Sequence, residues 1–134
     1  MPVLRKPAAA MLSCLALLAT ARAAADAVVV PPGIATHSDG RAPLEALYRA
    51  SLGLVEKGWT VETIVESAPA GTVAPLPIIA LCSPGAGPAV WILAGIHGEE
   101  PAGPNAVAAA IEDIARLGEQ RPVVLLRLLN PQGY

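Results

Sequence analysis

The sequence predicts an α/β fold built on a mixed sheet that contains one parallel βαβ unit. Segments that are apolar or alternate between apolar and polar residues predict strands near residues 60–65, 77–82, 89–96 and 123–129. Apolar residues at helical spacing predict helices over 43–57 and 101–117. A strand, a helix and a second strand in the order 89–96, 101–117, 123–129 predict a parallel pair joined by a right-handed crossover.

The first 25 residues have the pattern of a secretory signal peptide. Arg5 and Lys6 precede an apolar run over residues 8–20, and Ala21-Arg22-Ala23 offers a cleavage site with small residues on either side. A membrane anchor is the alternative, but a spanning helix needs about 20 apolar residues. Arg22 ends this run early. We therefore expect residues 1–25 to be removed and the protein to be periplasmic or secreted, without stable membrane association afterwards.

Residues 26–58 are expected to form an N-terminal arm and a helix. The arm has no periodicity and contains His37, which we interpret as a solvated loop histidine. Gly58 is a natural stop for the helix over 43–57. The strand at 77–82 ends in Cys82, which is expected to be a small buried apolar side chain and not a nucleophile.

The remaining elements belong to the predicted parallel unit. Residues 89–96 form a continuous apolar run, as in a strand buried on both faces. The helix over 101–117 has Pro101 in its first turn, and Gly118 is expected to end it. The strand at 123–129 is expected to leave an apolar edge uncovered.

Composition excludes one class of partner. The net charge is −2, without a basic stripe, and aromatic residues make up only 3% of the chain. Nucleic-acid binding relies on clustered cations and on aromatic stacking. We therefore expect no nucleic-acid partner.

Chemistry-bearing residues collect between the strand at 89–96 and the following helix. Functional groups gather where parallel strands end. His97 and Glu100 are three residues apart at a turn entering a helix, so both side chains can be aimed at one point. An imidazole and a carboxylate together suit Zn²⁺. Glu99 is expected to point away, toward solvent or the helix N-terminus. The spacing alone also fits ordinary acidic residues before a helix, so both readings stay open at this point.

Two motifs carry a resemblance to a known family. Residues 95–103 read Gly-Ile-His-Gly-Glu-Glu-Pro-Ala-Gly, which resembles the first zinc-binding motif of the M14 zinc metallocarboxypeptidase family. That superfamily also includes the succinylglutamate desuccinylase and aspartoacylase deacylases. Residues 130–134 read Asn-Pro-Gln-Gly-Tyr and resemble the peptidases' Asn-Pro-Asp-Gly-Phe/Tyr element, with Gln132 in place of the commoner aspartate. Residues 77–81 resemble the strand that precedes the zinc strand in this family. The similarity covers about residues 60–134.

The resemblance implies a site and a domain. His97 and Glu100 match the first two zinc ligands, while Asn130 and Gly133 would lie on the floor of the substrate site. In this family a third ligand, a histidine, and a glutamate that acts as general base come later in the chain. Residues 59–134 would then be the N-terminal part of the catalytic domain, a truncated carboxypeptidase-like sheet. We expect such a fragment to contain no catalytic residue of its own, to be inactive or nearly so, and to be poorly soluble.

The function implied is a zinc-dependent hydrolase that cleaves a C-terminal peptide or amide bond. A zinc deacylase acting on a small N-acyl substrate is the alternative within the superfamily. Arginine residues beyond the Asn-Pro-x-Gly element would distinguish a peptidase from a deacylase. A non-catalytic binding module remains the alternative from a different class if the chain is complete.

Overall fold

The computed structural model describes residues 38–67 and 76–134. The predicted signal peptide at 1–25 and His37 lie outside these residues. The elements are α2 (Leu44–Leu52), the 3₁₀ helix η1 (Gly53–Lys57), β1 (Thr60–Ser67), β2 (Leu76–Cys82), β3 (Val90–Leu93), α3 (Ala102–Ala109), α4 (Ile111–Gln120) and β4 (Val123–Leu126). The described part of the chain is therefore a mixed α/β structure, as the sequence predicts.

The strands form one sheet with the order β1-β2-β4-β3. β1 and β2 are antiparallel, and so are β2 and β4. β3 and β4 are parallel, with Val90 opposite Val123 and Leu93 opposite Leu126. The predicted parallel pair is confirmed, and the carboxyl ends of β3 and β4 meet at one edge of the sheet. The expectation of an open edge at 123–129 is wrong, because β4 lies between β2 and β3, and β3 is the last strand on that side among the described residues.

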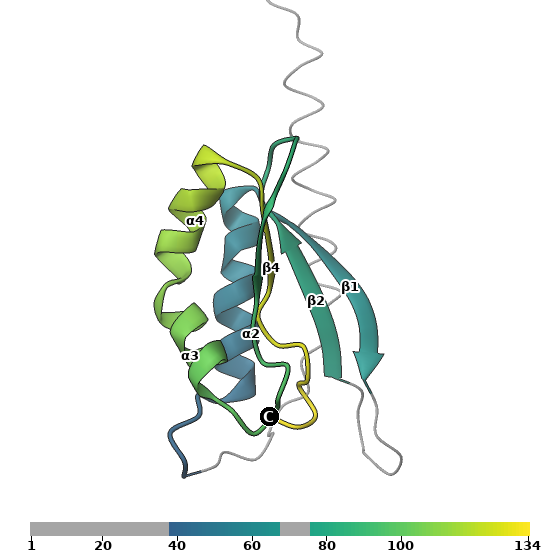
Figure 1. Cartoon of the computed structure of the whole chain (residues 1–134), viewed down its shortest axis with the longest axis vertical. Helices are drawn as coiled ribbons and strands as arrows, with labels where there is room; N and C mark the ends of the chain where they lie inside the picture. Colours follow the sequence, from purple (N-terminus) through teal and green to yellow (C-terminus); the bar gives the residue numbers. More distant parts are fainter. Residues whose placement is uncertain (1–37, 68–75) are drawn as a thin grey trace, which may run out of the picture.

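The helices α2, α3 and α4 gather on one side of the sheet (Figure 1). The core lies between this helical layer and the strands. Its most buried large side chains, each at most 1% exposed, are Leu47, Leu54, Trp59, Leu81 and Leu125. Burying one such side chain stabilises the fold by roughly 1.5–3 kcal/mol relative to leaving it in water. The side chains packed between the sheet and the helices therefore contribute strongly to stability.

β3 is exposed on its other face. Val90 and Ile92 pack against the core, whereas Trp91 is 63% exposed and Leu93 52% exposed. The expectation that residues 89–96 are buried on both faces is wrong for two reasons. β3 is an edge strand, and the helices of the described residues cover only one side of the sheet.

Two glycines have different effects on the helices. Gly58 ends η1 in a left-handed conformation (φ 87°), with its N–H directed at the carbonyls of Leu54 and Val55, so the predicted stop is confirmed. Gly118 does not end a helix, because α4 continues to Gln120. A Cβ on Gly118 would lie 2.4 Å from Cζ2 of Trp59, so a glycine is needed there for close packing.

The predicted helix over 101–117 is divided. α3 ends at Ala109 and α4 begins at Ile111, with Ala110 between them at φ −93° and ψ 10°. Alanine is the best helix former, so residue preference gives no warning of this break. No helix among residues 38–67 and 76–134 is long and apolar enough to cross a membrane.

Cys82 is half-buried at the end of β2. Burial raises the pKa of its thiol, with the nearby Glu62 carboxylate adding to the shift. A raised thiol pKa lowers the thiolate fraction at neutral pH, which disfavours nucleophilic chemistry. The side chain is less buried than the sequence suggests, but its environment agrees with a structural role.

Candidate metal site at the carboxyl edge of β3 and β4

The loop after β3 is held close to the residues that follow β4. Gly95 has a φ of 66°, which favours glycine. A Cβ at this position would lie 2.9 Å from Cδ1 of Leu128 and 3.2 Å from the carbonyl oxygen of Arg127. The chain then turns, and the Glu100 N–H donates to the carbonyl oxygen of His97 at 3.2 Å. This turn brings the side chains of His97 and Glu100 to the same side of the loop.

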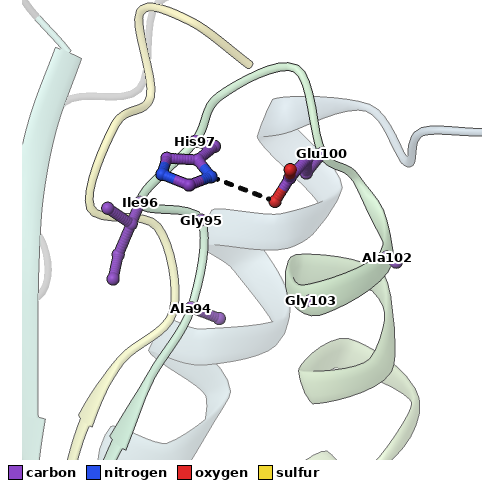
Figure 2. Close-up of a pocket in the computed structure, with 7 residues that line it drawn as sticks. All are labelled: Ala94, Gly95, Ile96, His97, Glu100, Ala102 and Gly103. Atoms are coloured by element: carbon purple, nitrogen blue, oxygen red, sulfur yellow. Dashed lines mark hydrogen bonds and ion pairs between the residues drawn. The ribbon is translucent and has the colours of Figure 1, made fainter.

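The two predicted ligands lie together. Nδ1 of His97 is 3.3 Å from Oε2 of Glu100 (Figure 2). The two side chains are 67% and 69% exposed. They line an open pocket of about 410 Å³ whose remaining wall comes from residues 94–96, Ala102 and Gly103. The site is thus open to solvent and accessible to an ion or a substrate.

The separation of the two atoms fits a shared metal ion. In a tetrahedral zinc site with ligand bonds of about 2.0–2.1 Å, neighbouring donor atoms are roughly 3.3 Å apart. An imidazole nitrogen and a carboxylate oxygen are both common zinc donors. The same distance of 3.3 Å also permits a weak direct contact between the two side chains. The donor types and their spacing therefore fit zinc.

The second motif follows the neighbouring strand. Beyond the ends of β3 and β4 the two segments stay paired, because the N–H of Leu129 donates to the carbonyl of Ala94 and that of Asn130 to Gly95 (3.1 and 2.7 Å). Oδ1 of Asn130 then accepts the N–H of Gly133 at 3.0 Å. This side-chain bond closes a turn of the kind that asparagine favours. Asn130 therefore lies at the strand end beside the one that leads to His97.

The two motif loops touch through a pair of glycines. A Cβ on Gly98 would lie 2.1 Å from the carbonyl carbon of Gly133, and a Cβ on Gly133 would lie 3.1 Å from Cα of Gly98. The first distance is too short for any side chain, and the obstacle is backbone. The segments around His97 and Asn130, which are separated in sequence by two helices and a strand, thus form one continuous surface.

The described residues supply two donors. Within residues 38–67 and 76–134, no cluster of three or more His, Cys, Asp or Glu side chains is placed to hold a metal ion. Glu99 is exposed. Catalytic zinc sites generally have three protein ligands, so His97 and Glu100 would form only part of one.

Asn105 is a structural residue beside this site that the sequence did not single out. Its Oδ1 accepts the N–H of Ala42 at 3.1 Å and the hydroxyl of Tyr134 at 3.2 Å, while its Nδ2 donates to the carbonyl of Gly40 at 2.9 Å. The guanidinium of Arg41 lies 5.2 Å from the centre of the Tyr134 ring. Asn105 therefore joins the arm, α3 and the second motif. The only sequence signal was an amide within an otherwise apolar helix.

Comparison with protein-family models, with curated proteins and with solved structures finds no match to this chain.

Proposed function

We propose that this chain provides the first two zinc ligands of a hydrolase of the metallocarboxypeptidase type, which cleaves a C-terminal peptide or amide bond. The observation that carries the proposal is the approach of His97 Nδ1 to Glu100 Oε2, 3.3 Å apart beside an open pocket. Both side chains lie at the carboxyl edge of a parallel strand pair. Ligands bind preferentially at such edges.

An ordinary surface ion pair explains this arrangement less well. Exposed pairs contribute about 0–1 kcal/mol to stability, so they give little reason for a constrained loop. Here the loop needs glycine at Gly95 and again at Gly98, where a Cβ would meet backbone or a neighbouring side chain. Glycine increases the entropy lost on folding. The proposed metal site accounts for why two such positions flank His97.

Each residue has a defined part in the proposed site. Zinc, when bound, polarises a carbonyl and lowers the pKa of water. Nδ1 of His97 and the carboxylate of Glu100 would hold the ion, and the contact between Gly98 and Gly133 positions the loop that bears them. Asn130 uses Oδ1 for the turn at Gly133, so it would contact a substrate through its amide N–H groups, as a donor to an oxygen.

The proposed activity belongs to a polypeptide that also supplies a third ligand and a general base. The resemblance implies that both follow the second motif, so residues 59–134 are proposed to be the N-terminal part of a larger catalytic domain. The signal-peptide pattern at 1–25 adds the proposal that this domain works in the periplasm or outside the cell. There it would meet peptides with free carboxyl ends.

Zinc titration of the purified chain by calorimetry tests the two ligands. Glu100→Gln and His97→Ala are expected to weaken zinc binding at least about tenfold, because each removes a donor atom. Glu99→Gln and His37→Ala are the matched controls, and both should bind zinc as the wild type does. Equal losses in Glu99→Gln and Glu100→Gln would contradict the assignment, since Glu99 is given no part in the site.

The reaction is tested separately, in a version of the protein that includes the third ligand and the base. Peptides with a free C-terminal carboxylate should be hydrolysed, and His97→Ala should abolish this hydrolysis. Hydrolysis of N-acyl amino acids alone would identify a deacylase and overturn the peptidase part of the proposal. Zinc binding without hydrolysis of either substrate class would favour a binding module.

A further inference from the structure

Arg127 has a buried guanidinium of which two nitrogen atoms make no hydrogen bond to the described residues. The residue follows β4 directly and is only 4% exposed. Its Nε and Nη1 atoms are buried and make no hydrogen bond in the part of the chain that the structure describes. Burial lowers the pKa of its guanidinium to about 10, so the group stays protonated at neutral pH. An unpaired buried charge is strongly unfavourable, and buried N–H groups in native proteins are nearly always bonded.

Arg127 lines a small, partly enclosed cavity between α2 and β2. Its volume is about 10 Å³, which is room for a single small species. The wall is completed by Tyr48, Ser51, Ile79, Leu81 and Leu128. None of these carries a carboxylate, and the hydroxyl of Tyr48 already donates to the carbonyl of Pro77 at 2.5 Å. The cavity therefore presents a cation with N–H donors and no negative charge of its own.

The described residues around Arg127 do not compensate its charge. Among them, the ionisable groups that interact electrostatically with it are the phenols of Tyr48 and Tyr134. Burial raises the pKa of both phenols above its usual value, so both are neutral at neutral pH. The described residues therefore leave this charge available to an anion that enters the cavity.

We propose that Arg127 and this cavity bind one small monovalent anion of the halide class, with chloride as its ordinary occupant. A water molecule would accept the two N–H groups but would leave the charge uncompensated, whereas a halide does both. Sulfate and other large oxyanions exceed the cavity. The site is distinct from the His97 and Glu100 pair, and it does not depend on the proposed zinc chemistry.

The anion would stabilise the folded chain by binding it in preference to the unfolded chain. Arg127 directly precedes Leu128, whose side chain packs where a Cβ on Gly95 would lie. An anion that fixes Arg127 thus also supports the segment beside the loop that bears His97. Stability should depend on the identity of the anion and not only on ionic strength.

Thermal unfolding of the full chain tests this at neutral pH, in sodium chloride and in sodium gluconate at equal ionic strength. Chloride and bromide should raise Tm by about 5 °C with a saturating dependence, while gluconate should not. Arg127→Met should abolish the difference between the two salts. Arg121→Met, which changes an exposed arginine before β4, should retain it.

A second measurement decides the matter if Arg127→Met does not fold. The NMR linewidth of chloride should show excess broadening in the presence of the wild type and of Arg121→Met, and bromide should remove it by competition. Superimposed chloride and gluconate curves for the wild type would overturn the proposal and indicate a water in the cavity. An unchanged chloride dependence in Arg127→Met, or no excess linewidth with the wild type, would overturn it as well.

Discussion

The core and the carboxyl edge of the sheet use glycine in the same way but to different ends. In the core, Gly118 of α4 leaves space for the indole of Trp59, which is 1% exposed. At the edge, Gly98 leaves space for the backbone of Gly133. The first contact joins a helix to the interior. The second joins two surface loops that carry candidate ligands. Replacing Gly118 should therefore change stability, whereas replacing Gly98 should change the geometry of the candidate ligands.

The core contact should give the largest change in stability. In Gly118→Ala the new Cβ would lie 2.4 Å from Trp59 and 2.9 Å from Cβ of Ser83, and both neighbours are buried. Overpacking typically costs 1–3 kcal/mol, partly offset by the better helix preference of alanine. We expect the free energy of unfolding to fall by about 2 kcal/mol, as measured by urea denaturation.

Gly53→Ala provides the control for this substitution. Gly53 has helical φ and ψ, and a Cβ there would meet nothing within 4 Å. This variant should unfold with unchanged or slightly higher stability. If both variants were equally stable, the contact between Trp59 and Gly118 would not constrain the core.

Disrupting the contact between Gly98 and Gly133 should change stability little and zinc affinity more. Gly98→Ala forces the two motif loops apart, but the residues on either side of Gly98, at 96–97 and 99–100, are exposed, so this loop can shift. We expect a loss of stability below about 1 kcal/mol, together with roughly tenfold weaker zinc binding because His97 and Glu100 are displaced. Gly103→Ala is the control. Gly103 lines the same pocket, and a Cβ there would lie 3.4 Å from Cβ of Ala94, which is an ordinary contact distance. That variant should keep its zinc affinity, and an equal loss there would indicate a nonspecific effect.

Local sequence patterns predict the helices and strands, but they do not predict which faces of these elements are buried or which residues they contact. The parallel pairing of β3 and β4 follows from the order of two apolar runs around a helix. Those runs do not reveal that β3 is the edge strand, because an apolar run looks the same whether one face or both are covered. The sequence predicts a helix stop at Gly118, because the residue that requires glycine there is Trp59, which is distant in sequence. His97 and Glu100 could be proposed from spacing, whereas the roles of Asn105 and Arg127 depend on tertiary contacts. The metal assignment stays a prediction.

Asn105 connects the two regions, so its loss should have an intermediate effect. Asn105→Ala removes bonds to Ala42, Tyr134 and Gly40. A partly buried hydrogen bond contributes about 0.5–1.5 kcal/mol net, and water can replace some of these bonds. We expect a loss of about 1 kcal/mol in urea denaturation. Asn105→Asp keeps the acceptor but not the donor to Gly40, so it should lose less, and an aspartate variant as unstable as the alanine variant would contradict this division.

The exposed face of β3 should give the smallest change in stability and a clear change in solubility. Trp91 is 63% exposed and Leu93 is 52% exposed on an edge strand whose segment, residues 89–96, contains no charged residue. Natural edge strands are usually protected by charges, prolines or bulges, since an apolar edge can pair with other chains. Trp91→Lys places a charge on this edge and removes little buried area. The free energy of unfolding should change by less than about 0.5 kcal/mol.

Light scattering at rising protein concentration measures the second part of this prediction. Aggregation of the wild type should begin at a lower concentration than aggregation of Trp91→Lys, because lysine opposes pairing between copies of the edge. Arg116→Lys is a suitable control, since it changes an exposed side chain on α4 without changing the charge. It should aggregate as the wild type does. If Trp91→Lys aggregates no less than this control, association proceeds through another surface, and β3 is not the vulnerable edge of the molecule.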